Sequence, residues 1–135
     1  MKRIPTFCAG IKLEDNYYDF IKVLGIELEN LGYIQYWNNG LMAGYSKSNW
    51  MYIFSGLDDY EGENVFSWQK EKNHCIYLID RLVSDGILVN EKINSKIERF
   101  FNIKNAAQTR YSFYPGKPKG ADQIDGIISR CLKSL

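Results

Sequence analysis

The chain has 135 residues, 45% of them hydrophobic and 15% aromatic, so it can bury the core of one domain. With 24% charged residues and no apolar run of membrane-spanning length, the composition argues against a disordered chain and against a membrane protein. The basic start, residues 1–5, is not followed by an uninterrupted apolar stretch, so no signal peptide is expected.

The first half of the chain predicts one helix followed by a small antiparallel sheet. A helix is predicted over residues 15–31, with one apolar face made by Phe20, Ile21, Leu24, Leu28 and Leu31. Aromatic and β-prone residues then predict strands at 33–37, 41–45 and 50–54, with a turn signal at 38–40. Residues 56–63 predict an exposed acidic loop rather than a calcium site, because the EF-hand spacing is absent.

The second half predicts four helices, over residues 71–85, 91–101, 105–114 and 122–135. Asn90 is the expected N-cap of the second helix, and residues 87–89 form a short extended link before it. The side chains expected to be buried are Cys75, Leu78, Ile79, Leu82, Val83, Ile93, Ile97, Phe100, Phe101, Ile124, Ile127, Ile128, Cys131 and Leu132.

Cysteine and histidine usage gives no support for a metal or other cofactor. The three cysteines, Cys8, Cys75 and Cys131, are odd in number, far apart and without a CxxC motif, which favours a reducing cytoplasm over a disulfide framework. The one histidine, His74, is next to Cys75, and neighbours on a helix point about 100° apart, so they do not form a ligand pair. With one histidine and no positioned acid, no catalytic site is predicted either.

The net charge of +1 is distributed unevenly along the chain. Residues 1–66 carry −4 and residues 67–135 carry +5, and the segment from Lys92 to the end carries +6. This asymmetry favours a polyanion as partner of the C-terminal part, and the alternative is an ordinary solvated surface.

The segment from Lys92 to Tyr114 has the layout of a helix-turn-helix, with Ile103 in the linker between two short helices. The second helix presents amide, hydroxyl and guanidinium groups suited to base edges in the major groove, on Asn105, Gln108, Thr109 and Arg110. Basic side chains placed to contact phosphates are Lys96, Arg99 and Lys104. Helical hairpins with polar faces also occur in proteins that do not bind DNA, so both interpretations stay open.

The stretch Gly116-Lys117-Pro118-Lys119-Gly120 has the residue types of a phosphate-binding loop in the wrong order for an NTPase. Two lysines just before a helix N-terminus nevertheless suit a contact to a phosphate backbone. Asp122 and Asp125, in the first turn of that helix, compete for the same positive end. The loop therefore predicts either a phosphate clamp or a turn beside a capped helix.

Three segments, "SWQKEKNHCIYLIDRLVSDGIL", "IERFFNIKNAAQTRY" and "GKPKGADQIDGII", occur in this order. The region 66–135 resembles the C-terminal domain of RteC-type regulators and related small mobile-element proteins of Bacteroidetes. The resemblance implies a helical, winged-helix-like domain in a DNA-binding regulator of element excision or transfer. The matching positions are Trp68, Leu78, Phe100, Gln108, Lys117, Pro118, Lys119, Ile124 and Asp125.

We therefore expect an α+β fold, in which an N-terminal subdomain (1–65) packs on a C-terminal helical, winged-helix-like bundle (66–135). The expected function is that of a non-enzymatic, cytoplasmic DNA-binding regulator of a mobile element, without a cofactor and without a membrane partner. The alternative is a protein-interaction module that acts through residues 33–54 and the acidic loop, with a homodimer through the sheet edge. Burial of Tyr36, Trp37, Trp50 and Tyr52 would count against the interaction module, and burial of Gln108 and Arg110 against DNA binding.

Overall fold

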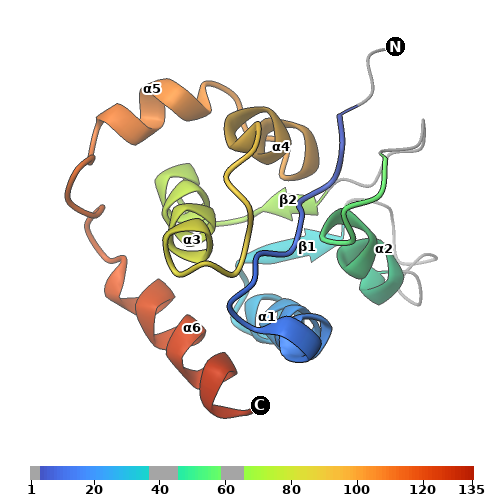
Figure 1. Ribbon diagram of the computed structural model, residues 1–135. Coiled ribbons are helices and arrows are strands. Elements are labelled where there is room, and N and C mark those ends of the chain that lie inside the picture. Colours follow the sequence, from blue (N-terminus) through green and yellow to red (C-terminus); the bar gives the residue numbers. More distant parts are fainter. Residues whose placement is uncertain (1–3, 37–45, 59–65) are drawn as a thin grey trace.

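The computed structural model describes residues 4–36, 46–58 and 66–135 (Figure 1). Its described part has six α-helices and two strands, so the predicted α+β class is confirmed. In chain order the elements are a short 3-10 helix Glu14–Asn16, α1 Tyr17–Asn30, β1 Ile34–Tyr36, α2 Ser46–Ile53, β2 Phe66–Trp68, α3 Lys72–Ser84, α4 Ile93–Phe100, α5 Ala106–Tyr111 and α6 Asp122–Lys133. Among these helices, none is both long and apolar enough for a bilayer crossing.

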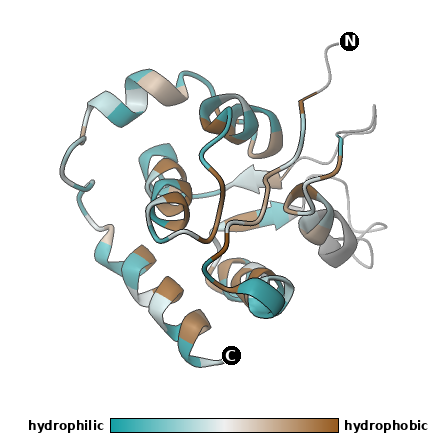
Figure 2. Ribbon diagram, viewed as in Figure 1, coloured by the Kyte–Doolittle hydropathy of each residue, from teal (hydrophilic) through white to brown (hydrophobic). Residues whose placement is uncertain are grey.

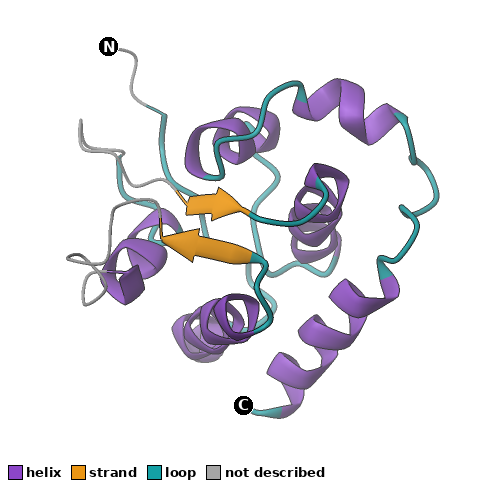
Figure 3. Cartoon of the chain, turned by 180° about the vertical axis from the view of Figure 1, so that it is seen from behind, coloured by secondary structure: helices purple, strands orange, loops and turns teal. Residues whose placement is uncertain are grey.

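The sheet joins the two predicted subdomains. Strand β1 pairs antiparallel with β2, with Ile34 opposite Trp68 and Tyr36 opposite Phe66, near the middle of the molecule (Figure 3). The predicted strand at 33–37 is confirmed in its centre, but its partner comes from beyond residue 65. The predicted strand at 41–45 lies outside the described residues.

The predicted strand at 50–54 is wrong, because this segment belongs to α2 and the turn after it. Ile53 and Phe54 follow Trp50 by three and four residues, which is the spacing of one helical face, and all three side chains are buried. The indole nitrogen of Trp50 donates to the carbonyl of Ile21 on α1, at 2.7 Å. This contact needs a close approach, since a Cβ on Gly25 of α1 would lie 2.6 Å from that nitrogen.

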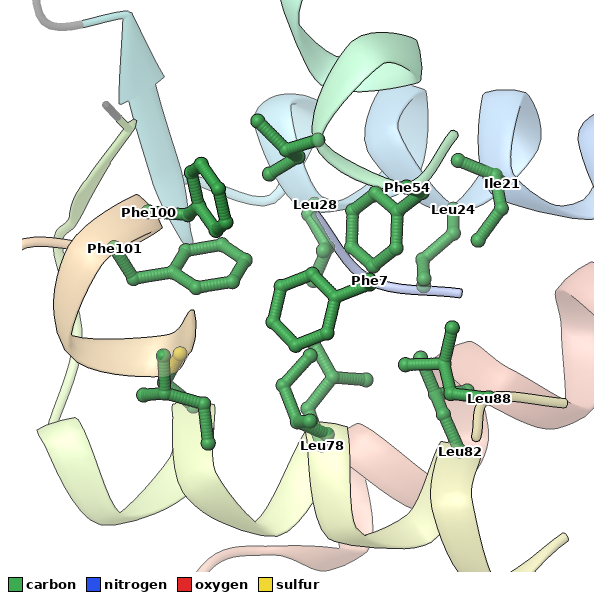
Figure 4. Packing of buried hydrophobic residues seen from close by; sticks show 14 of the residues in the cluster. Phe7, Ile21, Leu24, Leu28, Phe54, Leu78, Leu82, Leu88, Phe100 and Phe101 are labelled. Atoms are coloured by element: carbon green, nitrogen blue, oxygen red, sulfur yellow. The ribbon is translucent and has the colours of Figure 1, made fainter. Parts of the chain in front are cut away.

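One core holds residues from both halves of the chain, and Phe7 lies near its centre (Figure 4). The Phe7 ring stacks on Phe54 with centroids 5.0 Å apart, and lies 6.0 Å from Phe100 of α4. Leucines of α1 and α3 pack around these rings. The predicted core is largely confirmed, but Leu31 is 44% exposed at the end of α1.

The N-terminal segment is tied to the link between α3 and α4. Ala9 and Leu88 form an antiparallel bridge, the Gly10 N–H donates to the Ile87 carbonyl at 2.7 Å, and the Val89 N–H donates to the Cys8 carbonyl at 2.9 Å. The predicted extended link at 87–89 therefore contributes to the core.

All four predicted C-terminal helices are present, with shifted ends. Helix α4 begins at Ile93 after Lys92, whose φ of 51° is left-handed, so the predicted cap at Asn90 is wrong. Helix α5 is shorter than predicted and ends at Tyr111. The chain from α5 through residues 112–121 to α6 curves around α3 (Figure 1). Hydrophobic residues recur along α1, α3 and α6, whereas α5 is mostly hydrophilic or neutral (Figure 2).

Candidate nucleic-acid interface

Lys96 does not reach the surface. It lies on α4 with its side chain fully buried, and its Nζ has no hydrogen-bond partner within the described part of the chain. A buried ammonium cannot contact a phosphate backbone, so Lys96 leaves the set of predicted phosphate contacts. It lies three residues after Ile93 and four before Phe100, so it shares their inward face.

Arg110 holds α5 on α3 and α4. Its Nε and Nη2 donate to the two carboxylate oxygens of Asp80, at 2.8 and 2.9 Å, and its Nη1 donates to Asn94. The side chain is only 20% exposed. A bidentate guanidinium–carboxylate pair is strong and geometrically specific, so Arg110 positions the helix, and the three donors used in these contacts are not available to bases.

Lys117 closes the Gly116–Gly120 stretch onto the start of α6. Its ammonium pairs with Asp122 and, at 3.2 Å, with Asp125. Hydrogen bonds to Asp122 and then Asp125 raise the pKa of Lys117 above its usual value. Pro118 is buried. The stretch is therefore a turn beside a helix whose acidic first turn neutralises Lys117, and this lysine is not a free phosphate ligand.

Lys119 lies on the other side of the same turn, against α3. The Nε2 atom of His74 is 2.8 Å from the carbonyl oxygen of Lys119. A carbonyl only accepts, so the ring nitrogen carries the proton in this contact. The side chain of Lys119 is exposed, while Cys75, the neighbour of His74, is buried in the core.

The backbone of Lys104, which precedes α5 in the chain, also lies beside the start of α3. The ammonium of Lys72, in the first turn of α3, donates to the Lys104 carbonyl at 3.3 Å. Lys72 and the main-chain carbonyls of Lys104 and Lys119 therefore lie at one helix start, whose N-cap is Glu71 and whose first turn has no acidic residue. All three lysines are exposed. The helix dipole adds positive potential there. We call Lys72, His74, Lys104 and Lys119 the α3-start cluster.

Lys72 and His74 of this cluster were not among the predicted contacts. Both precede the predicted helix-turn-helix by about twenty residues, and only the path of the chain brings them beside Lys104 and Lys119. The signal in the sequence was the basic pair Lys70 and Lys72 at the start of a predicted helix, where Glu71 is the one acidic residue.

The outward face of α5 continues from the cluster. Gln108 and Tyr111 are exposed and lie three residues apart, which places them on one side of α5, and Lys104 is exposed just before the helix. Asn105 is exposed at the helix start, and Thr109 is half-buried. The Glu98 carboxylate accepts from the Ala106 N–H at 2.9 Å and so caps α5. Arg99 is half-buried, with its guanidinium carbon 5.4 Å from the centroid of the Phe100 ring.

The aromatic residues of the N-terminal half mostly face inward. Tyr33, Trp50 and Phe54 are buried, and Tyr52 is half-buried with its hydroxyl bonded to the Asp58 carbonyl. Trp37, the Tyr36 side chain and most of the acidic loop lie outside what the structure describes. Most of the described aromatic side chains in residues 33–54 are thus not available to form the predicted interaction surface.

In comparisons with known proteins, no family model, curated protein or solved structure matched the chain. The resemblance of residues 66–135 to RteC-type regulators therefore stays a prediction.

Proposed function

We propose that the chain is a non-enzymatic DNA-binding regulator, which contacts phosphates through the α3-start cluster and bases through the outward face of α5. The observation that carries the proposal is that Lys104 and Lys119, both exposed, have their main-chain carbonyls bonded at the start of α3 beside the exposed Lys72. Lys104 and Lys119 have no ion-pair partner within the described residues, so their charges are free to replace the counterions of a phosphate backbone.

The helix-turn-helix layout supports the same proposal. Helices α4 and α5 are joined by residues 101–105, and Ile103 is buried at the linker, as a plug between two helices should be. Gln108 and Asn105 stand exposed, where their amides can pair with base edges. The winged-helix-like comparison, the mobile-element context and the cytoplasmic location rest on the resemblance and on cysteine usage, and they belong to the proposal.

The test is a salt titration of binding to random duplex DNA, with two double variants of equal charge. Lys104→Ala/Lys119→Ala removes two cluster cations, and Lys12→Ala/Lys133→Ala removes two exposed lysines elsewhere. We expect the first variant to flatten the slope of log affinity against log salt by about 1.8, at about 0.9 for each lost phosphate contact. The control variant should keep the wild-type slope.

Two results would contradict the proposal. One is the absence of duplex binding by the wild-type protein at low salt. The other is an equal change of slope in both double variants, which would mean that the overall charge of the protein, and not the cluster, attracts the DNA.

A further inference from the structure

A groove of about 440 Å³ lies between α3, α4 and the turn that follows α5. Its volume is within the range of about 300–1,000 Å³ that is usual for small-molecule sites. It is lined by Asp80, Val83, Ser84, Asn90, Ile93, Asn94, Arg110 and Tyr114. It lies on the inner side of α5, whereas the proposed base contacts Asn105 and Gln108 are exposed.

The polar side of the groove has unused hydrogen-bonding groups. A guanidinium has five N–H donors, and Arg110 uses three of them on Asp80 and Asn94. Two donors remain, held in place by a fixed and mostly buried side chain. Asn90 and Ser84, both exposed, add an amide and a hydroxyl that can donate and accept.

The remaining lining is aromatic and aliphatic. Tyr114 is 67% exposed and lines the groove, while Val83 and Ile93 supply aliphatic surface. The Tyr114 N–H donates to the Arg110 carbonyl at 2.9 Å, so the backbone of the aromatic residue is fixed relative to the guanidinium. An aromatic face beside convergent polar groups suits a flat heterocycle with a polar edge.

We propose that this groove binds one unstacked base of a single-stranded nucleic acid. The base stacks on Tyr114 and places its polar edge against Arg110 and Asn90, while the α3-start cluster holds phosphates of the same strand. A base in a duplex has its faces stacked and its pairing edge occupied, so only a single-stranded or extruded base can enter. This inference rests on the proposed function, and it specifies a single strand as the preferred form of the partner.

The experiment compares Tyr114 with a tyrosine outside both proposed binding surfaces. Tyr18 of α1 is 50% exposed and does not line the groove, so Tyr18→Ala is the control for Tyr114→Ala. Binding is measured by fluorescence anisotropy with a labelled single strand of about 12 nucleotides and mixed sequence, a length within usual site sizes. A hairpin duplex of the same sequence is the second probe. Thermal denaturation checks that each variant is folded.

We expect Tyr114→Ala to weaken binding of the single strand about tenfold, because stacking is usually worth roughly that factor per base or more. Tyr114→Phe should keep the wild-type affinity, since its ring stacks equally well. Tyr18→Ala should change the affinity less than Tyr114→Ala, and neither of these two tyrosine variants should change duplex binding. Asn90→Ala should weaken binding of the single strand without affecting the duplex.

Wild-type affinity for the single strand in Tyr114→Ala would overturn the inference, and so would equal losses in the two tyrosine variants. The lysine variants separate this failure from failure of the proposed function. If Lys104→Ala/Lys119→Ala flattens the salt slope for the duplex but Tyr114→Ala has no effect, the surface binds nucleic acid and only the base site is wrong.

Discussion

Lys96 shows how one side chain can have a different role from the one its charge predicts. Its ammonium is fully buried on α4 without a partner in the described part of the chain. Burying a polar group without a hydrogen bond costs about 1–3 kcal/mol in mutational data, and an unpaired charge costs more. Lys96 adds nothing to the surface charge, and we expect its unpaired nitrogen to lower the stability of the fold.

We expect Lys96→Met to raise the free energy of unfolding by about 1–3 kcal/mol or more, because methionine fills similar space without the unpaired nitrogen. Urea denaturation measures the change. Lys104→Met, at an exposed position, is the control and should stay within about 0.5 kcal/mol of wild type. A loss of stability in Lys96→Met would mean that the ammonium has a stabilising partner.

At the scale of elements, α2 docks on α1 through a position that only glycine fits. A Cβ at Gly25 would lie 2.6 Å from Nε1 of Trp50, the atom that donates to the Ile21 carbonyl. Helix α6 also has an interior glycine, Gly126, but there the nearest atom to an added Cβ is an Arg130 guanidinium nitrogen at 3.5 Å. The two glycines therefore differ in tertiary contact and not in local structure.

We expect Gly25→Ala to lower the free energy of unfolding by about 1–3 kcal/mol, because the indole must move and its hydrogen bond is strained. Gly126→Ala should raise it by about 0.5–1 kcal/mol, since alanine is the better residue inside a helix. Thermal denaturation should show shifts of opposite sign. A shift of the same sign in both variants would refute the close approach of α2 to α1.

At the scale of the whole molecule, Asp125 links three segments. Its carboxylate accepts from the Tyr77 hydroxyl at 2.7 Å, pairs with Arg81 of α3, and lies 3.2 Å from the Lys117 ammonium. Partial burial alone would raise the pKa of Asp125, but the hydrogen bonds from Tyr77 and Lys117 and the charge of Arg81 lower it below the usual value. The carboxylate thus prefers the folded state when it is ionised.

The sign of the pH dependence follows from this lowered pKa. A carboxyl whose pKa is depressed in the folded state stabilises the protein above its unfolded pKa, about 3.9, and this stability is lost as the pH falls further. We expect wild-type unfolding free energy to decline below about pH 4, and Asp125→Asn to decline less steeply. Asp122→Asn, at a side chain that is 86% exposed, should follow the wild-type profile. Identical acid profiles for wild type and Asp125→Asn would mean that the contacts of Asp125 do not contribute to the pH dependence of stability.

The helices and the strand that depend only on the spacing of nearby residues could be predicted from the sequence. The apolar spacing from Phe20 to Leu28 predicted α1, and the same argument located α3, α4, α5 and α6 to within a few residues. The strand around Ile34 followed from its β-prone composition. These features depend on residues three or four apart, or on alternation along one strand, so they can be read without knowledge of the chain path. They also gave the α+β class.

Contacts between residues far apart in the sequence could be learned only from the tertiary structure. It gave β1 its partner in β2, and it made α2 a helix because Trp50 meets Ile21 across 29 positions. It buried Lys96 and paired Arg110 with Asp80, and it brought Lys72 beside Lys104. The identity of a lysine or arginine in the sequence does not reveal whether its side chain is buried, paired or free. Only its neighbours in space determine which charges can contact a partner.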